Sequence, residues 1–279
     1  MLQPAKTKTA EIIDHLNRMK IGDKSNMFYF RRYRNDANAL KNARPVEYYE
    51  ICGAIACLEQ NIEDMRSWHQ KAITASGNDS NVIVNYGMSL AKLGFYAEAY
   101  KMFKKAFGKN PDNSIKLYYI HSCYENGRFF EAYECVRNMS VQEACNVGLL
   151  EDEIAQISEA VNILDGKGLT DDDVSRAIAC VEGCLQSMSI FGVGRDVSTF
   201  TNDEFILYTY FFQFDGVDLL ELDYQLEQKL EEAGVSEAVL SVLEFDFAMI
   251  DDEKPVQDVV QLSEEKMALV RDLVAHVEL

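Results

Sequence analysis

The sequence predicts a mainly α-helical fold with an α+β C-terminal domain. Two observations predict it. Small residues recur about 34 positions apart between residues 46 and 145, as in a stack of helical hairpins. The run Phe205 to Phe214 is rich in β-branched and aromatic residues, which is typical of a strand. Charge divides the chain between these regions: residues 1–150 carry 20 Lys and Arg against 16 Asp and Glu, whereas residues 151–279 carry 7 against 30.

The length of 279 residues, with 48% hydrophobic residues, is enough for two domains with buried cores. We predict a helical repeat domain over residues 1–150 and an acidic α/β domain over residues 165–279, joined by a helix over 151–164. The seven cysteines are odd in number and lie in segments predicted to be helical, so we expect reduced thiols. The chain has no apolar run of membrane-spanning length and no signal peptide, so we expect a cytoplasmic location.

Two helices are predicted before the repeats, over residues 11–20 and 26–42. They either cap the repeats or form a fourth, diverged copy. The second contains a basic cluster interleaved with aromatic residues, which is interpreted as a contact with an acidic protein surface, as an RNA contact or as a solvated helix face. The basic residues of this cluster are Arg31, Arg32, Arg34, Lys41 and Arg44.

Three repeat copies are predicted, over residues 46–79, 80–113 and 113–145. In the middle copy, small side chains such as Gly87 allow two helices to cross closely, and Gly94 supplies the turn between them. The first copy has Gly53 at the position of Gly87. It has Gln60 at the turn position, so we expect Asn61 to take the left-handed conformation there.

The middle copy resembles the tetratricopeptide repeat family. The matching residues are Tyr86, Gly87, Leu90, Gly94, Tyr96, Ala99, Phe103, Ala106 and Pro111. The resemblance extends over residues 46–139 and implies a concave groove, lined by the first helix of each repeat, that binds a segment of another protein. The groove residues that it implies are Glu50, Asn81, Val84, Asn85, Met88, Lys92, Leu117, His121 and Tyr124.

Some members of this family clamp a C-terminal carboxylate with Lys, Asn and Arg side chains. Only Asn85 matches that set, and Glu50 stands where it would repel a carboxylate, so we expect no carboxylate clamp. The chain is also loosely similar to bacterial type III secretion chaperones, which are short arrays of about three such repeats.

The second half is predicted to alternate helices and strands. Thr170 and Asp173 form a capping-box pattern that opens a helix ending near Met188. After the strand 205–214 we expect a helix from Leu219 to Gly234, a strand over 239–250 and a final helix over 264–277. The strand 205–214 is apolar on both faces and is therefore central or covered. A further strand comes from residues 190–201 or from a partner.

These patterns favour a non-enzymatic interaction protein, an adaptor or chaperone that holds a partner segment in the repeat groove. No set of nucleophile and base, no metal-ligand set and no cofactor loop stands out, so we predict no catalysis, no metal and no cofactor. The partner is predicted to be a protein, with a basic surface if the acidic half contacts it, rather than nucleic acid or membrane. The alternative is an antitoxin or immunity protein whose acidic domain neutralises a basic toxin or nuclease. The oligomeric state stays open.

Overall fold

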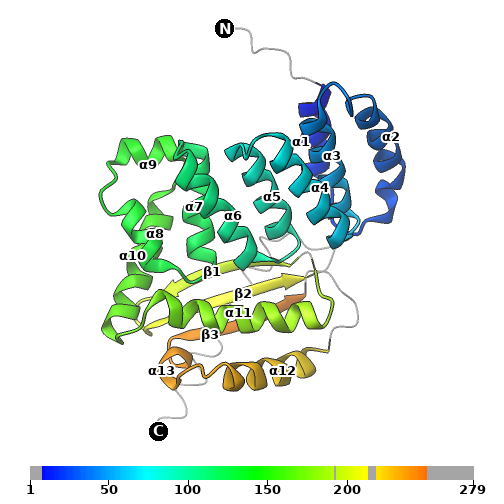
Figure 1. Cartoon of the computed structure of the whole chain (residues 1–279). Helices are drawn as coiled ribbons and strands as arrows, with labels where there is room; N and C mark the ends of the chain where they lie inside the picture. Colours follow the sequence, from blue (N-terminus) through cyan, green and yellow to red (C-terminus); the bar gives the residue numbers. More distant parts are fainter. Residues whose placement is uncertain (1–7, 192, 213–217, 250–279) are drawn as a thin grey trace.

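The computed structural model describes residues 8–191, 193–212 and 218–249. It confirms the predicted class, because these residues form thirteen α-helices, one 3₁₀ helix and a single three-stranded sheet near the C-terminal end (Figure 1). No helix in the described part of the chain is long and apolar enough to cross a bilayer.

Helices α3 to α8 form three consecutive hairpins, which we call the first, second and third hairpins. Their bounds are α3 (Pro45–Leu58) with α4 (Ile62–Ala75), α5 (Ser80–Lys92) with α6 (Tyr96–Lys109), and α7 (Asn113–Glu125) with α8 (Phe129–Val136). The hairpins stack side by side (Figure 1). Before them lie α1 (Lys8–Asn17), η1 (Lys24–Asn26) and α2 (Met27–Asn38), so both helices predicted there end earlier than expected.

Close helix crossing in the first two hairpins depends on glycine. A Cβ on Gly87 would stand 2.8 Å from Phe103, and a Cβ on Gly53 would stand 2.8 Å from His69. His69 and Phe103 are themselves 34 positions apart, so the two hairpins repeat the same contact. A substituted side chain at either glycine would force the helices apart, since packed cores tolerate little extra volume.

The turns inside the three hairpins share one geometry. Gly94 and Gly127 have φ of 87° and 66°, and Gln60 takes the same left-handed region with φ of 57°. The prediction for Asn61 was therefore wrong. Asn61 caps α4, where its side chain accepts a hydrogen bond of 3.2 Å from the Asp64 N–H. Asn side chains favour this capping role because their oxygen satisfies a free N–H in the first helical turn.

The second half begins with α9 (Val141–Val147), α10 (Glu151–Gly166) and α11 (Asp171–Ser187). The Thr170 and Asp173 side chains form the predicted capping box at the start of α11. The remaining elements are β1 (Gly194–Phe200), β2 (Phe205–Phe212), α12 (Leu219–Glu232), α13 (Glu237–Leu240) and β3 (Leu243–Met249).

The sheet has the order β1-β2-β3, with β1 antiparallel and β3 parallel to β2. The strand predicted from its apolar residues is thus the central one, and β1 lies within the segment 190–201. The prediction for residues 239–242 was wrong, because Ser236 caps the short helix α13 there and β3 starts at Leu243. The predicted end of the central strand and the helix predicted over 264–277 fall outside the described residues.

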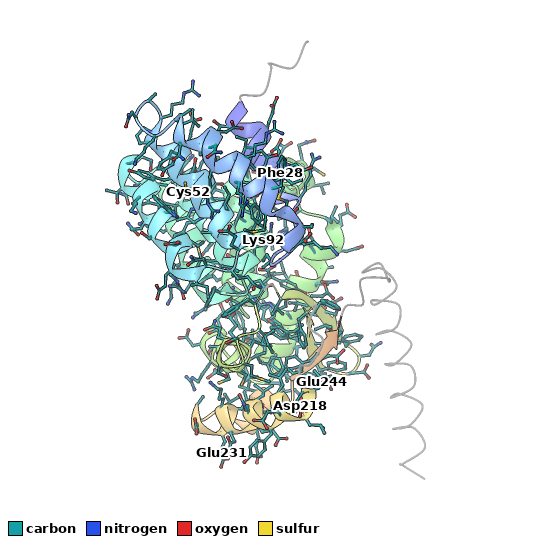
Figure 2. All side chains as sticks on the ribbon, turned by 90° about the vertical axis from the view of Figure 1, so that its right-hand side faces the viewer. Phe28, Cys52, Lys92, Asp218, Glu231 and Glu244 are labelled. Carbon is teal, nitrogen blue, oxygen red and sulfur yellow. The ribbon has the colours of Figure 1, made fainter. Side chains whose placement is uncertain are left out.

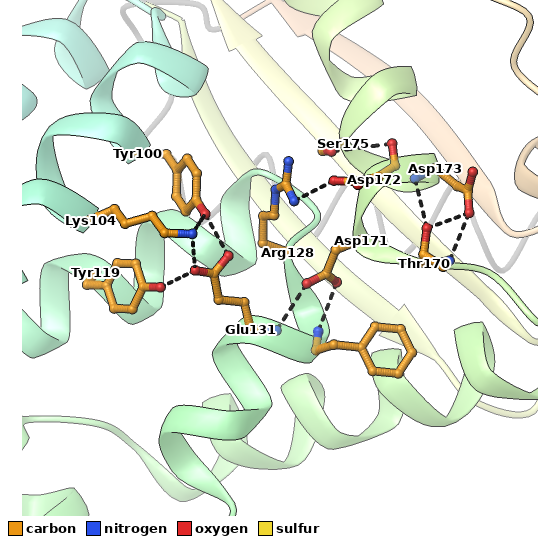
Figure 3. A network of polar contacts seen from close by, with 11 residues as sticks. Tyr100, Lys104, Tyr119, Arg128, Glu131, Thr170, Asp171, Asp172, Asp173 and Ser175 are labelled. Atoms are coloured by element: carbon orange, nitrogen blue, oxygen red, sulfur yellow. Dashed lines mark hydrogen bonds and ion pairs between the residues drawn. The ribbon is translucent and has the colours of Figure 1, made fainter. Parts of the chain in front are cut away.

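Helix α11 fastens the second half to the hairpins. Asp171 accepts hydrogen bonds from the N–H groups of Phe130 and Glu131, 2.9 and 3.1 Å long, at the start of α8 (Figure 3). Glu182 accepts one of 3.2 Å from the N–H of Ala97, at the start of α6. Eleven residues are about three helical turns, so both carboxylates point from the same face of α11. Neither α6 nor α8 has a side-chain cap of its own.

Candidate partner-binding groove

The first helices of the first two hairpins line a cavity of about 240 Å³. Four of the predicted groove residues, Glu50, Asn85, Met88 and Lys92, lie in its wall. Helix α1 forms the opposite wall, and its contribution was not predicted. Its lining residues are Ile13, Leu16 and Asn17. The cavity is therefore lined by residues of four helices, α1, α3, α4 and α5.

Polar groups inside this cavity are arranged in pairs. Asn85 donates a hydrogen bond of 2.7 Å to Glu50, and burial raises the pKa of the Glu50 carboxyl above its ordinary value. Lys92 donates one of 3.3 Å to the carbonyl of Asn17, at the end of α1, and burial lowers the pKa of its ammonium. The lysine stands where the negative end of a helix dipole favours a cation.

His69 and Ser89 form a third polar pair in the cavity wall. The His69 Nε2 and the Ser89 Oγ lie 2.8 Å apart, and burial lowers the pKa of the imidazole to about 4. The imidazole is therefore uncharged at neutral pH. Its Nδ1 has no hydrogen-bond partner among the described residues.

A second, larger cavity of about 670 Å³ adjoins the first and lies between the hairpins and the sheet. Lys92 lines both cavities, so they meet at this side chain, and we call the two cavities together the recess. Tyr96 and Glu125 line it from the hairpins and Phe211 from β2. Burial raises the pKa of the Glu125 carboxyl, with the charge of Arg195 acting in the opposite direction.

Next to the larger cavity, the side chain of Arg195 in β1 is fully buried. Its guanidinium carbon lies 3.8 Å from the centre of the Tyr96 ring and its Nη1 lies 3.5 Å from a carboxylate oxygen of Glu182. Tyr96 also donates a hydrogen bond of 2.6 Å to the carbonyl of Val193. These contacts join α6, α11 and β1 beside the larger cavity.

The predicted groove residues of the third hairpin contact the chain itself. Tyr124 donates hydrogen bonds to Gln156 of α10 and to the carbonyl of Val197 in β1, at 3.0 and 3.2 Å. The ring of His121 lies 3.2 Å from the Glu153 carboxylate of α10. Leu117 packs beside the turn at Gly148. Helices α9 and α10 and strand β1 therefore cover the groove face that the first two hairpins leave available.

Two further predicted groove residues lie outside both cavities. Asn81 is exposed in the first turn of α5, and Val84 is buried in the core between the hairpins. The structure thus brings together four of the nine predicted residues and separates the other five from them.

The lining residues that sequence reasoning missed come from segments distant in the chain. The pattern Ile12, Ile13 and Leu16 marks α1 as amphipathic, which indicates that it packs on something, but the spacing does not say on which helix. The sequence also indicated that Phe211 is covered, because both faces of its predicted strand are apolar.

Comparisons with models of protein families, with curated proteins and with solved structures find no match to this chain.

Proposed function

We propose that this chain is a non-enzymatic interaction protein, an adaptor or chaperone that holds an extended segment of a partner protein in the recess of the first two hairpins. The observation that carries the proposal is the pair of adjoining cavities that share Lys92. Their walls combine apolar side chains with a few convergent polar groups, which is the usual make-up of binding sites.

The resemblance to tetratricopeptide repeats supports the same proposal, because such repeats bind segments on the side where these cavities lie. The carboxylate clamp remains an unsuitable model. Asn85, the one matching residue, already donates to Glu50, and the carboxylate of Glu50 faces the same cavity. The partner segment is therefore expected to contact the recess through internal residues rather than through its C-terminal carboxylate.

A photo-crosslinking amino acid at position 88 tests this proposal in cells, with the same amino acid at position 101 as a control. Met88 lines the smaller cavity, whereas Lys101 is exposed on α6 of the same hairpin. We expect crosslinks to one defined partner segment from position 88 and none to that segment from position 101.

The crosslinked segment, made as a fluorescent peptide, then gives affinities. Met88→Arg is expected to weaken binding at least about tenfold, because it places bulk and charge at the centre of the contact, and Lys101→Glu is expected to change it less than about twofold. Equal affinities for both variants would contradict the proposal.

The second candidate is the neutralising protein, and the charge of residues 151–279, 7 basic against 30 acidic residues, favours it. This candidate would be supported if the chain binds a single basic partner and Met88→Arg leaves the affinity for that partner unchanged. Salt should then release the partner, because opposite charges hold the complex together.

A further inference from the structure

Two exposed helix faces of opposite charge lie at opposite ends of the molecule. Phe28 of α2 is near one end and Glu231 of α12 near the other (Figures 1 and 2). We define the α2 face as Met27, Phe28, Arg31 and Arg32. We define the α12 face as Leu220, Tyr224, Glu227 and Glu231. Neither face contributes a lining residue to the recess of the proposed function.

The α2 face is apolar as well as basic. Phe28 is 71% exposed and Met27 is 41% exposed, while Phe30 and Tyr33 on the other side of the helix are buried against α3. Helical spacing places the exposed Arg31 and Arg32 beside the Phe28 ring. The outermost element of a helical stack is usually polar on its outer side, because nothing covers it. This end of the stack instead presents an aromatic ring flanked by arginines.

The α12 face also combines apolar and charged side chains, but its charge is negative. Leu220 is 81% exposed and Tyr224 is 56% exposed, one helical turn apart. The exposed carboxylates of Glu227 and Glu231 continue this stripe along the helix. The inner side of α12, with Leu222, Leu226 and Leu230, is buried in the core beneath the sheet and α11. Leu220 and Tyr224 therefore form a small apolar patch bordered by carboxylates, the arrangement of polar residues around apolar ones that is found at interaction sites.

We infer that the α2 face of one copy of this chain docks on the α12 face of a second copy. The apolar side chains would then cover one another, and the arginines would face the glutamates. The net charge of −19 opposes association at long range. Salt screens that repulsion beyond about 8 Å at physiological ionic strength, whereas ion pairs at contact distance are screened much less. The contact is heterologous, since each copy uses a different face, and it therefore builds a row or a ring of copies.

Sedimentation velocity of the full chain at near-physiological salt tests this inference. We expect the weight-average sedimentation coefficient to rise between about 10 and 500 μM, because two single-helix faces make a contact below the standard interface size. Arg31→Glu with Arg32→Glu reverses the α2 face, and Glu227→Arg with Glu231→Arg reverses the α12 face. All four side chains are exposed, so circular dichroism spectra and thermal melting should stay close to those of the original chain.

Each reversed protein alone is expected to stay monomeric, because like charges then face one another. An equimolar mixture of the two is expected to associate again, since every contact between unlike chains pairs opposite charges. A chain carrying all four substitutions should associate as the original does. A concentration-independent coefficient for the original chain would overturn the inference. So would association that survives either reversal, or an α2 face whose arginines bind a homopolymeric RNA while the chain stays monomeric.

Discussion

The second and third hairpins follow the same sequence pattern but present their first helices to different surroundings. The first helix of the second hairpin lines a recess through Asn85, Met88 and Lys92. The first helix of the third hairpin presents His121 and Tyr124 to α10 and β1 of the same chain. The hairpin pattern therefore specifies how two helices cross, and the side chains on the outside decide whether a face stays available or is covered by the chain.

The second helices of neighbouring hairpins make similar polar contacts, so these contacts do not account for the difference. Arg66 of α4 makes two hydrogen bonds of 2.7 Å to Glu98 of α6. Glu131, 33 positions later, accepts hydrogen bonds of 2.6 Å from Lys104 and from Tyr100 of α6 (Figure 3). A glutamate of the following hairpin thus accepts hydrogen bonds from the second helix of the preceding one at both junctions, and the hairpins differ in what covers their faces and turns.

The largest expected effect comes from the turn of the third hairpin. A Cβ on Gly127, whose φ is 66°, would stand 2.4 Å from Val174 and 2.7 Å from Ile178 of α11. We expect Gly127→Ala to lower the free energy of unfolding by about 3 kcal/mol, from left-handed strain together with overpacking. Urea denaturation measures this.

Gly77→Ala is the matched control, because its φ is 68° and its Cβ would meet nothing within 4 Å. Strain alone should then cost about 1 kcal/mol. Equal losses for the two variants would mean that α11 does not pack on the third hairpin as described.

The next effect concerns the helix caps. Asp171→Ala removes the acceptor of two N–H groups at the start of α8, so we expect it to cost about 1–2 kcal/mol and to speed hydrogen exchange in α8 and α11 together. Asn61→Ala removes the cap that α4 supplies for itself and should speed exchange in α4 alone. Asp172→Ala breaks only an exposed ion pair with Arg128 and should cost less than about 0.5 kcal/mol. Exchange confined to α8 in Asp171→Ala would argue against a joint unit of α8 and α11.

The smallest effect is a pH dependence at the contact between the second and third hairpins. Burial raises the pKa of the Glu131 carboxyl, but hydrogen bonds from Lys104, Tyr100 and Tyr119 outweigh it, and the pKa lies below its ordinary value of 4.5. A lowered pKa in the folded state stabilises the fold above pH 4.5 and loses that contribution as the pH falls through the folded-state pKa.

Glu131→Gln should therefore lower stability at pH 7 by about 0.5 kcal/mol, a modest figure because solvent screens this partly exposed group. The difference from the original chain should shrink as the pH falls below 4.5 and vanish once the pH is below the folded-state pKa, as both side chains are then uncharged. A difference that stays the same at every pH below 4.5 at which the chain is folded would assign the loss to packing instead.

The hairpins and the central strand could be predicted from the sequence because both depend on local patterns. The spacing of Gly53, Gly87 and their partners specifies helix crossing, and the apolar run 205–212 specifies a covered strand. The recess was predicted only in part. Parts of its walls come from α1 and β2. The predicted groove residues of the third hairpin do not line it, because side chains such as Tyr124 contact segments more than 30 residues away. Pairings over such distances leave no periodic trace in one sequence, so spacing alone does not locate them.

The carboxylates of Asp171 and Glu182 in α11, which accept hydrogen bonds from α8 and α6, affect how this protein can be divided for experiments. A fragment cut after residue 150 keeps all three hairpins, yet it leaves two helices of the array without acceptors for their first N–H groups. A fragment that keeps both carboxylates extends through α11, which ends at Ser187. It still lacks the carbonyls of Val193 and Val197 that accept hydrogen bonds from Tyr96 and Tyr124. The charge boundary along the chain is therefore not the boundary at which the molecule can be cut.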